Sequence, residues 1–236
     1  MPDYTDRLIT LVIPVKDEAR EVIAGVVFKA QAHGWRVIVV DDGSLLPVKL
    51  ASIRFEVPRG YGAAIKAGVR AATTDFVATM DGDGQHTAWD VKRLEDFLVY
   101  FKPDMVIGDR RLKEHGIRLW GRKVLNWTAT LFAGRWIPDL NSGSRIFRRS
   151  IALGYEPILS DRFSFTTSLT LSMLADHYAV DWLPIKVWPR QHGATRVKLW
   201  QDGLRTLWLI CWIGLALRTR RIRGWMRRFR GHSNIT

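Results

Sequence analysis

The stretch from residue 76 to residue 86 reads FVATMDGDGQH, an apolar run that passes directly into two aspartates separated by a glycine, Asp81 and Asp83. Two carboxylates so close together repel each other unless a positive charge lies between them. The same residues could simply form a polar turn after a strand, because Asp and Gly are common in turns. By itself this stretch leaves the turn and the cation site equally open.

Four short apolar runs in the first half of the chain end in polar or glycine residues, and each is predicted to be a β-strand. They cover residues 8–15, 35–44, 76–85 and 103–111. The composition and spacing of the segments between them predict helices over residues 18–33, 61–72 and 88–101. Apolar strands that alternate with helices indicate an α/β fold, with a mostly parallel sheet and helices on both faces.

In such a sheet the carboxyl ends of the parallel strands meet at one edge, where ligands bind. The unusual polar clusters fall at these ends: Pro14-Val15-Lys16-Asp17-Glu18, Asp41-Asp42-Gly43-Ser44, Asp81-Gly82-Asp83 and Gly108-Asp109-Arg110. We therefore predict one site at this edge, although Asp41 and Asp42 could simply cap a loop. Residues 60–68 (GYGAAIKAG) are interpreted as a glycine-rich helix start that allows close packing.

The sequence has neither a GxGxxG after the first strand nor a GxxxxGK[ST], so both standard phosphate-binding loops are missing. A divalent cation held by a few carboxylates would neutralise a bound phosphate instead, and Mg²⁺ and Mn²⁺ prefer such oxygen ligands. Asp81 and Asp83 stand two apart on a segment predicted to be extended. Their side chains and that of Gln85 would then lie on one side and offer three oxygen donors. His86 is expected to be a turn residue or to support the ligands.

The charge of the chain indicates an anionic partner. Its 236 residues carry a net charge of +13, and seven arginines fall within the last nineteen residues. They follow an apolar run at 207–217 that contains Trp208 and Trp212, which favours a membrane surface over a nucleic acid.

The single cysteine, Cys211, excludes an internal disulfide and a cysteine-built metal site. The first residues do not resemble a signal peptide, so we expect the folded part in the cytosol.

Several motifs carry a family resemblance. VIPVKDE, VDDGS, GYGAA and DGDGQH, in this order, resemble the family 2 inverting glycosyltransferases with a GT-A fold. The later motifs VIGDRR, LNSGSRIFRR and PRQHGATRVKLW are similar to the polyprenyl-phosphate (dolichol-phosphate) mannose synthase and glucosyltransferase branch. The resemblance runs from about residue 8 to about residue 203. It implies transfer of a hexose, mannose or glucose, from a GDP- or UDP-sugar to polyprenyl phosphate, with Mg²⁺ or Mn²⁺ as cofactor.

The resemblance also implies roles for individual residues. Donor-binding residues would be Pro14, Val15, Asp17, Glu18, Asp41, Asp42, Asp81, Gly82, Asp83, Arg190 and Arg196. Metal ligands would be Asp81, Asp83 and Gln85, and the acceptor phosphate would meet Arg110, Arg122 and Arg145. Of these, Asp81, Asp83, Arg110 and Arg190 would be catalytic.

The sequence also departs from the family pattern. The helix and strand that usually follow Asp-Asp-Gly-Ser appear trimmed, because only about fifteen residues separate Ser44 from the next glycine-rich segment. Asp109 stands where a small residue is more usual, and Ser144 replaces a frequent aromatic residue. The multi-helix transmembrane tail of some relatives is missing. We expect a GT-A domain over residues 1–197 and a basic, tryptophan-rich, membrane-associating segment over residues 198–236.

A phosphate acceptor is already anionic near neutral pH, so the transfer of a sugar to it needs no general base. Transfer to a hydroxyl acceptor does need one. One alternative is therefore a family 2 transferase acting on a saccharide, lipid or protein hydroxyl, with Asp109 or Asp139 as the base. Another is a non-catalytic module on the same fold that binds anions or membranes.

We expect a peripheral or monotopic enzyme on the cytoplasmic side of a membrane, with an interfacial helix near residues 207–217 and no nucleic-acid partner. The run at 119–137 could be core or membrane-facing.

Overall fold

The computed structural model describes residues 9–110, 117–186, 188 and 203–213, with only the backbone described at residues 117–119 and 122. The strands are β1 (Ile9–Val15), β2 (Arg36–Asp41), β3 (Ile53–Arg54), β4 (Phe76–Thr79), β5 (Met105–Asp109), β6 (Arg145–Arg148) and β7 (Val180–Pro184). The helices are α1 (Arg20–Gln31), α2 (Tyr61–Ala71), α3 (Ala88–Phe101), α4 (Ile117–Ala133), α5 (Arg149–Tyr155) and α6 (Phe165–Ala175). A short 3-10 turn, η2 (Glu156–Ile158), follows α5, and residues 203–213 form a further helix.

The described strands form one sheet in the order β3-β2-β1-β4-β6-β5-β7. β1 pairs in parallel with β2 and β4, β2 pairs in parallel with β3, and β5 pairs in parallel with β7. Only β6 is antiparallel to its neighbours, β4 and β5. β5 therefore runs in the same direction as β4, and the mostly parallel sheet predicted from the sequence is confirmed. The strands β3, β6 and β7 were not predicted.

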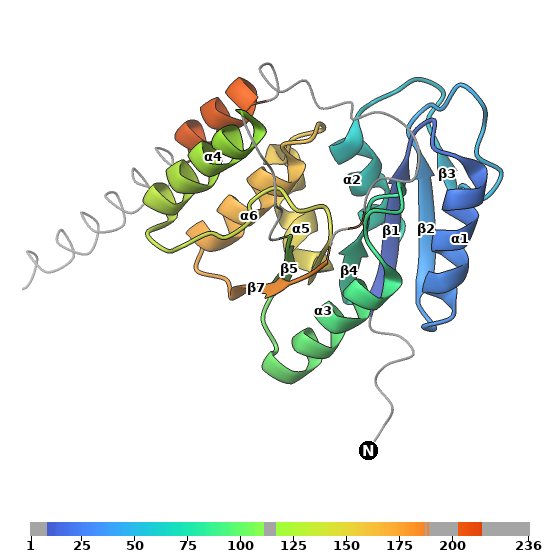
Figure 1. Ribbon diagram of the computed structural model, residues 1–236, viewed down its shortest axis with the longest axis horizontal. Coiled ribbons are helices and arrows are strands. Elements are labelled where there is room, and N and C mark those ends of the chain that lie inside the picture. The colour runs from blue at the N-terminus through green and yellow to red at the C-terminus, as the bar shows by residue number, and fades with distance from the viewer. Residues whose placement is uncertain (1–8, 111–116, 187, 189–202, 214–236) are drawn as a thin grey trace, which may run out of the picture.

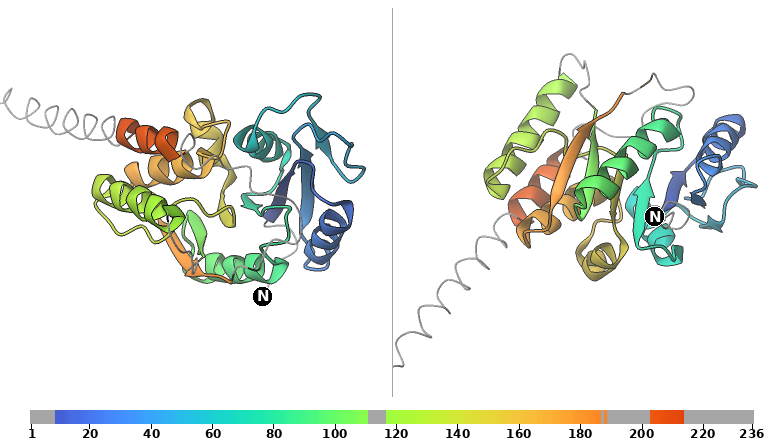
Figure 2. Two further views of the ribbon diagram at one scale, coloured as in Figure 1. Left: turned by 45° about the horizontal axis from the view of Figure 1, so that its top comes forward. Right: turned by 90° about the horizontal axis from the view of Figure 1, so that it is seen from below.

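Helices cover both faces of this sheet (Figures 1 and 2). On one face α1 and α3 supply Ile23, Val91 and Leu94 to a core with alternate residues of β1. On the other face α2, α4, α5, α6 and helix 203–213 supply a second core, in which Ile65 and Ile210 are buried. All seven residues of β1 are buried, as expected for a central strand covered on both faces.

The local sequence explains where the elements begin and end. α3 starts with a capping box, in which the Thr87 hydroxyl accepts from the Asp90 backbone and the Asp90 carboxylate accepts from the Thr87 backbone. α2 confirms the close-packing interpretation of its glycines, because a Cβ on Gly68 would lie 2.3 Å from Val12 Cγ1. No helix in the described ranges is both long enough and apolar enough to span a bilayer.

Candidate active site

The loops after β1, β2 and β4 meet at one edge of the sheet, because these three strands are parallel neighbours. We call this region the carboxylate edge; it consists of Asp17, Asp41, Asp42, Asp81 and Asp83 with their loops. The first two loops are joined directly, since Leu45 N donates to Asp17 Oδ1 at 2.7 Å and Asp17 N donates to Ser44 Oγ at 2.8 Å. Pro14 and Val15 lie in β1, with Val15 paired to Asp41.

Asp41 and Asp42 both organise the chain that follows β2. Asp41 accepts hydrogen bonds from the backbone N–H groups of Ser44 (2.9 Å) and Val48 (3.2 Å) and pairs with Arg54 at 2.5 Å. Burial alone would raise the pKa of Asp41, but its hydrogen bonds with Ser44, Val48 and Arg54 outweigh burial and hold the pKa below its ordinary value.

Asp42 accepts from the backbone N–H groups of Arg59 (2.6 Å) and Gly60 (3.0 Å), and so holds the start of α2. The chain between the two aspartates and α2 forms only the two-residue strand β3 and no helix, which agrees with the trimmed unit expected from the sequence. Loop capping by both carboxylates is therefore observed, and their contact with a donor nucleoside stays a prediction.

The expectation that Asp81, Asp83 and Gln85 follow one another on an extended segment is wrong. β4 ends at Thr79, and Gly82 and Asp83 form a turn. The chain approaches β1 closely at this turn, where only glycine fits, because a Cβ on Gly82 would lie 2.6 Å from Val15 Cγ1. Asp83 turns inward, with 4% exposure, and its Oδ1 accepts from Gln85 N at 3.0 Å. The two carboxylates still share one turn, beside the ends of β1 and β4.

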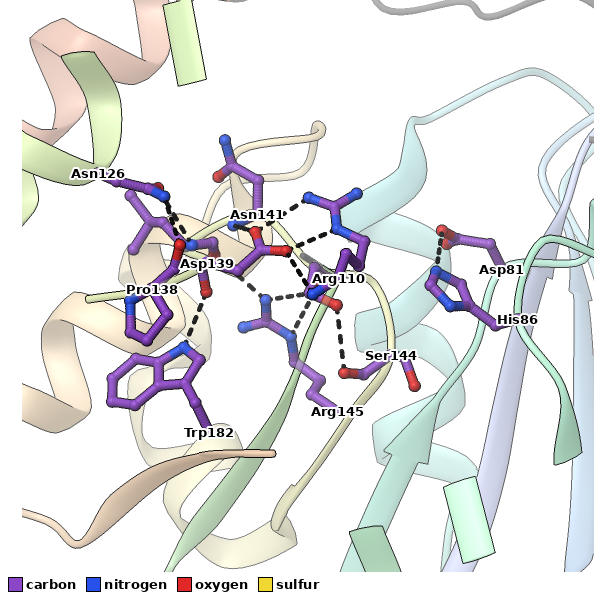
Figure 3. Close-up of polar contacts among 12 residues, drawn as sticks. Asp81, His86, Arg110, Asn126, Pro138, Asp139, Asn141, Ser144, Arg145 and Trp182 are labelled. Atoms are coloured by element: carbon purple, nitrogen blue, oxygen red, sulfur yellow. Dashed lines mark hydrogen bonds and ion pairs between the residues drawn. The ribbon is translucent and has the colours of Figure 1, made fainter. Parts of the chain in front are cut away.

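The Asp81 carboxylate is the more open of the two, with about 30% of its side chain exposed. The Tyr61 hydroxyl donates to its Oδ1 at 3.0 Å, and Nε2 of the buried His86 lies 3.9 Å from its Oδ2 (Figure 3). On a further side it lies against the main chain of Gly143, where a Cβ would approach both carboxylate oxygens to 2.6 Å. His86 therefore lies beside Asp81, within the turn region, as a supporting residue would.

The donor set fits a cation that is shared with a substrate. Within the described part of the chain, no three His, Cys, Asp or Glu side chains gather closely enough to enclose a metal ion. The two carboxylates of Asp81 and Asp83 would leave several coordination positions on a cation for water and phosphate oxygens. Mg²⁺ in nucleotide enzymes is commonly bound in this way, by one or two carboxylates plus the phosphates of the substrate.

A cationic region adjoins the carboxylate edge at Gly143. We call it the arginine side; it consists of Arg110, Asp139, Arg145 and the loop 139–144. Arg110 donates from Nε to Asp139 Oδ2 at 2.7 Å and from Nη2 to Asp139 Oδ1 at 3.0 Å (Figure 3). Asp139 is 1% exposed and is held further by Asn141 N and by the Trp182 indole, which donates to its carbonyl at 2.9 Å. This bidentate pair fixes the direction of the Arg110 guanidinium.

Asp139 is therefore the orienting partner of Arg110, a role that sequence reasoning missed. The two residues are 29 positions apart, and only the sequence LNSGSR after Asp139 marked this loop as part of a site. Both of its carboxylate oxygens accept from a guanidinium that remains charged at all working pH values. A carboxylate held in this way is a poor general base, which weakens the interpretation of Asp139 as the base for a hydroxyl acceptor.

Arg145 lies below the loop 139–144 with 1% exposure. Its guanidinium donates to the carbonyls of Ser142 at 2.9 Å and Thr166 at 3.0 Å, and to Thr170 Oγ1 at 3.0 Å. Burial lowers the pKa of Arg145 to about 10, so the side chain is still cationic at neutral pH. These contacts tie the loop to α6. Direct contact between Arg145 and an acceptor phosphate stays a prediction.

The remaining predicted arginines cannot be placed in the site. Arg122 belongs to α4, where only its backbone is described, and Arg190 and Arg196 lie outside the described residues. The segment that leads toward Arg190 and Arg196 is anchored beside the turn at Asp81 and Asp83, because Trp188 N donates to Gln85 O at 3.0 Å.

The sheet order and the carboxylate edge define a GT-A-type glycosyltransferase fold. Glucosyl-3-phosphoglycerate synthase from Mycobacterium tuberculosis, solved with Mn²⁺ and UDP-glucose, matches 87% of this chain with a TM-score of 0.67 and 19% identity, over 79% of that chain. The family model for glycosyl transferase family 2 matches residues 10–154, so the chain belongs to this family and is a glycosyltransferase.

Two curated relatives have names that state an acceptor. A dodecaprenyl-phosphate galacturonate synthase of Rhizobium johnstonii is 30% identical over 165 residues, covering 61% of this chain and 48% of the relative. A UDP-N-acetylglucosamine–dolichyl-phosphate N-acetylglucosaminyltransferase of Methanococcus voltae is 25% identical over 226 residues, covering 81% and 90%. An uncharacterised glycosyltransferase of Mycobacterium bovis is 30% identical over 199 residues, covering 80% and 89%. The chain thus spans about half the length of the Rhizobium relative.

Proposed function

We propose that this glycosyltransferase moves a hexose, mannose or glucose, from a UDP- or GDP-sugar to a polyprenyl phosphate, with inversion at the anomeric carbon. The observation that carries the proposal is the bidentate Arg110–Asp139 pair beside the Asp81–Asp83 turn. It provides an oriented cation where an anionic acceptor would approach, and it occupies Asp139, one of the two carboxylates considered as a base for a hydroxyl acceptor. The names of the Rhizobium and Methanococcus relatives support the same acceptor class.

The reaction then requires little proton transfer. A phosphate oxygen of the acceptor forms a bond to the anomeric carbon, while the bond from that carbon to the donor diphosphate breaks and the nucleoside diphosphate leaves with the electron pair. Arg110 binds and orients the acceptor phosphate, because its planar fork suits phosphate oxygens. A bound Mg²⁺ or Mn²⁺ would neutralise charge on the departing diphosphate. Asp81 and Asp83, with Gln85, would hold that ion, and Arg190 and Arg196 would approach the donor phosphates.

The direct test is to incubate the purified protein with undecaprenyl or dolichyl phosphate and a panel of labelled UDP- and GDP-sugars. A labelled, acid-labile lipid product that forms only with the phosphorylated lipid is the expected result. The matched control is the same lipid as its free alcohol. Transfer to the alcohol, or to a saccharide hydroxyl instead of the phosphate, would replace this proposal with the hydroxyl-acceptor alternative.

The protein would work as a peripheral membrane enzyme, and the outer face of α4 supports this location. Trp120, Val124, Trp127 and Leu131 are all exposed, and their spacing places them in one stripe along the helix. The opposite face of α4 buries Ala129 against the core. A helix that is apolar on both faces fits a position between a protein core and a lipid surface.

Helix 203–213 has the same two-faced character. Ile210 and Ile213 are buried in the core, and Thr206 contacts Ser164 at 2.9 Å, so the inner face docks onto the domain. Trp208 and Trp212 are exposed and stacked, with ring centroids 6.4 Å apart. Docking onto the protein, the alternative to an interfacial helix near 207–217, accounts for the inner face over residues 203–213. The exposed tryptophans on the outer face support the proposal that this face contacts lipid.

In each view of Figures 1 and 2, α4 and helix 203–213 lie together at the end of the molecule away from β3. The sequence continues from this helix into seven arginines, which would meet anionic lipid headgroups at roughly 1 kcal/mol each near the surface. We therefore propose that the two outer faces rest on an anionic bilayer. The membrane-associating segment 198–236 would act through the outer face of its helix and through its basic end.

A flotation assay with liposomes that contain phosphatidylglycerol tests this location. The double variant Trp120→Gln/Trp127→Gln should lose most of its liposome binding without a loss of nucleotide affinity. The matched control is Trp89→Gln/Tyr100→Gln on α3, which changes two exposed aromatic residues on the other side of the sheet. Equal flotation of the two double variants would show that the α4 stripe does not contact lipid.

A further inference from the structure

Tyr61 is the first residue of α2, and it reaches the proposed metal turn from a distant part of the chain. Its hydroxyl donates to Asp81 Oδ1 at 3.0 Å, across 20 positions of sequence. The ring stacks on Phe163, with centroids 5.6 Å apart and planes inclined by 20°. The hydroxyl is thus held at the end of a ring that is itself packed.

The backbone around Tyr61 has little freedom to move. Gly60 has a φ of +113°, and a Cβ there would lie 2.5 Å from Asp161 O. A Cβ on Gly62 would lie 2.2 Å from Ser160 O, so both glycines permit direct contact between the start of α2 and the loop 159–162. Ala63 N donates to Asp161 O at 3.0 Å, and Lys66 Nζ pairs with Asp161 Oδ1 at 2.8 Å.

Asp81 also lies against the main chain of the loop 139–144. The carboxylate lies against Gly143, where a Cβ would come within 2.6 Å of both oxygens. Gly143 is fixed in turn, because its carbonyl accepts from the buried Thr79 hydroxyl at 2.6 Å. Since about 30% of the Asp81 side chain is exposed, burial does not hold it, and its orientation depends on Tyr61, Gly143 and the nearby ring of His86.

We propose that Tyr61 is a positioning residue, which together with the bare backbone of Gly143 fixes the Asp81 carboxylate in the orientation that binds the cation and the donor diphosphate. This inference rests on the proposed role of Asp81 as a ligand. The Tyr61 hydroxyl is the donor in this contact, because an ionised carboxylate can only accept hydrogen bonds. Outer partners of metal ligands commonly contribute a factor of about 10–100 in metal affinity.

The test variant is Tyr61→Phe, which removes the hydroxyl and keeps the ring that stacks on Phe163. Mn²⁺ affinity is measured by electron paramagnetic resonance in the presence of UDP and, separately, of GDP. We expect the dissociation constant for Mn²⁺ to rise about tenfold, at the lower end of the range for such partners. The melting temperature should stay within about 2 °C of the wild type, because the ring remains packed.

The matched control is Tyr155→Phe. Tyr155 also donates its hydroxyl to a carboxylate, that of Asp176, but this pair is exposed and joins α5 to the end of α6. Its loss should leave the affinity for Mn²⁺ unchanged. A second probe is Gly143→Ala, in which the new methyl group would displace the Asp81 carboxylate. It should weaken Mn²⁺ binding by a similar factor.

The outcomes separate this inference from the function on which it rests. If Asp81→Asn and Asp83→Asn leave Mn²⁺ affinity unchanged, the proposed metal site itself is wrong. If both weaken it while Tyr61→Phe binds Mn²⁺ as the wild type does, the metal site stands and the positioning role of Tyr61 is refuted. If Tyr155→Phe weakens Mn²⁺ binding as much as Tyr61→Phe, the effect is not specific to Asp81 and the inference fails.

Discussion

The carboxylate edge and the arginine side meet at Gly143, and they hold side chains of opposite charge with different partners. At the edge, Asp41 and Asp42 are stabilised mainly by backbone N–H groups, and Asp81 by a tyrosine hydroxyl. On the arginine side the cations are oriented by a buried carboxylate and by backbone carbonyls. In the proposed reaction, the edge would need an added cation to accept a diphosphate, whereas the arginine side could meet a second anion directly.

The largest effect is expected from removing a carboxylate of the proposed metal site at Asp81 and Asp83. Asp83→Asn should abolish transfer, because the loss of one hard ligand weakens both ion affinity and charge neutralisation at the leaving diphosphate. Excess chelator should inactivate the wild type in the same way, and added Mn²⁺ should restore it. Radiolabelled transfer and circular dichroism would be measured together. Full activity in chelator would show that the carboxylate edge does not need a metal, and the proposed contrast with the arginine side would then be wrong.

The next effect concerns the arginine side. Arg110→Ala should lower transfer about tenfold to a hundredfold through the acceptor KM or kcat, because a charge-assisted phosphate contact contributes roughly 1.5–3 kcal/mol. Donor affinity, measured by calorimetry, should change little. Arg122→Ala is expected to act in the same direction.

Arg110→Ala also leaves Asp139 buried without its cation, which can destabilise the fold. The control is the double variant Arg110→Ala/Asp139→Asn, which removes the buried charge. We expect it to recover thermal stability and not transfer. If the double variant regains activity, Arg110 serves only to neutralise Asp139; if donor affinity falls as much as acceptor affinity, the two phosphate sites have been assigned to the wrong sides.

The smallest effect is expected at Asp41, where the carboxylate holds a loop. Asp41→Asn should reduce stability by about 1–3 kcal/mol, because buried N–H donors and Arg54 lose an ionised acceptor. The folded pKa of Asp41 lies below its ordinary value of 3.8, so its contribution is present above that pH and is lost as the pH falls through the folded pKa. Melting curves of both proteins should therefore differ most near neutral pH and converge in acid. A loss of nucleotide affinity well beyond the loss of stability would instead place Asp41 against the donor.

The elements that were predicted well are those with a strong local pattern. The helix over residues 88–101 has the predicted bounds, because its apolar periodicity and its capping box agree. The starts of β1, β2, β4 and β5 were also predicted to within two residues, since each apolar run has a clear beginning, but only β1 ends where it was predicted to end. β6 was missed because its four residues, RIFR, are too few to show a period, and it pairs only through contacts with β4 and β5.

The predicted strand over residues 76–85 shows where local reasoning failed. Its apolar run predicted an extended chain through Gln85, but the structure turns at Gly82, where the chain packs against Val15. That contact joins residues 67 positions apart, so no local window contains it. The structure brings the acidic strand ends to one edge, as the sequence predicted, and the roles of these residues stay predictions. The orientation that we propose for Asp81 depends on Tyr61 and Gly143, for which the sequence analysis predicted no role in the site.

The sequence by itself determined the parallel α/β core, the presence of acidic residues at the strand ends and the concentration of arginine near one end of the chain. These follow from the period of apolar residues and from composition, which are local properties. The tertiary structure alone decided which carboxylates accept hydrogen bonds from the backbone of loops. It also decided that Asp139 orients Arg110 and that backbone carbonyls surround Arg145. It also decided that helix 203–213 has a docked face and an exposed face. Hydrogen bonding and burial join residues that are far apart in the chain, so only the packed fold specifies which partners each charge meets.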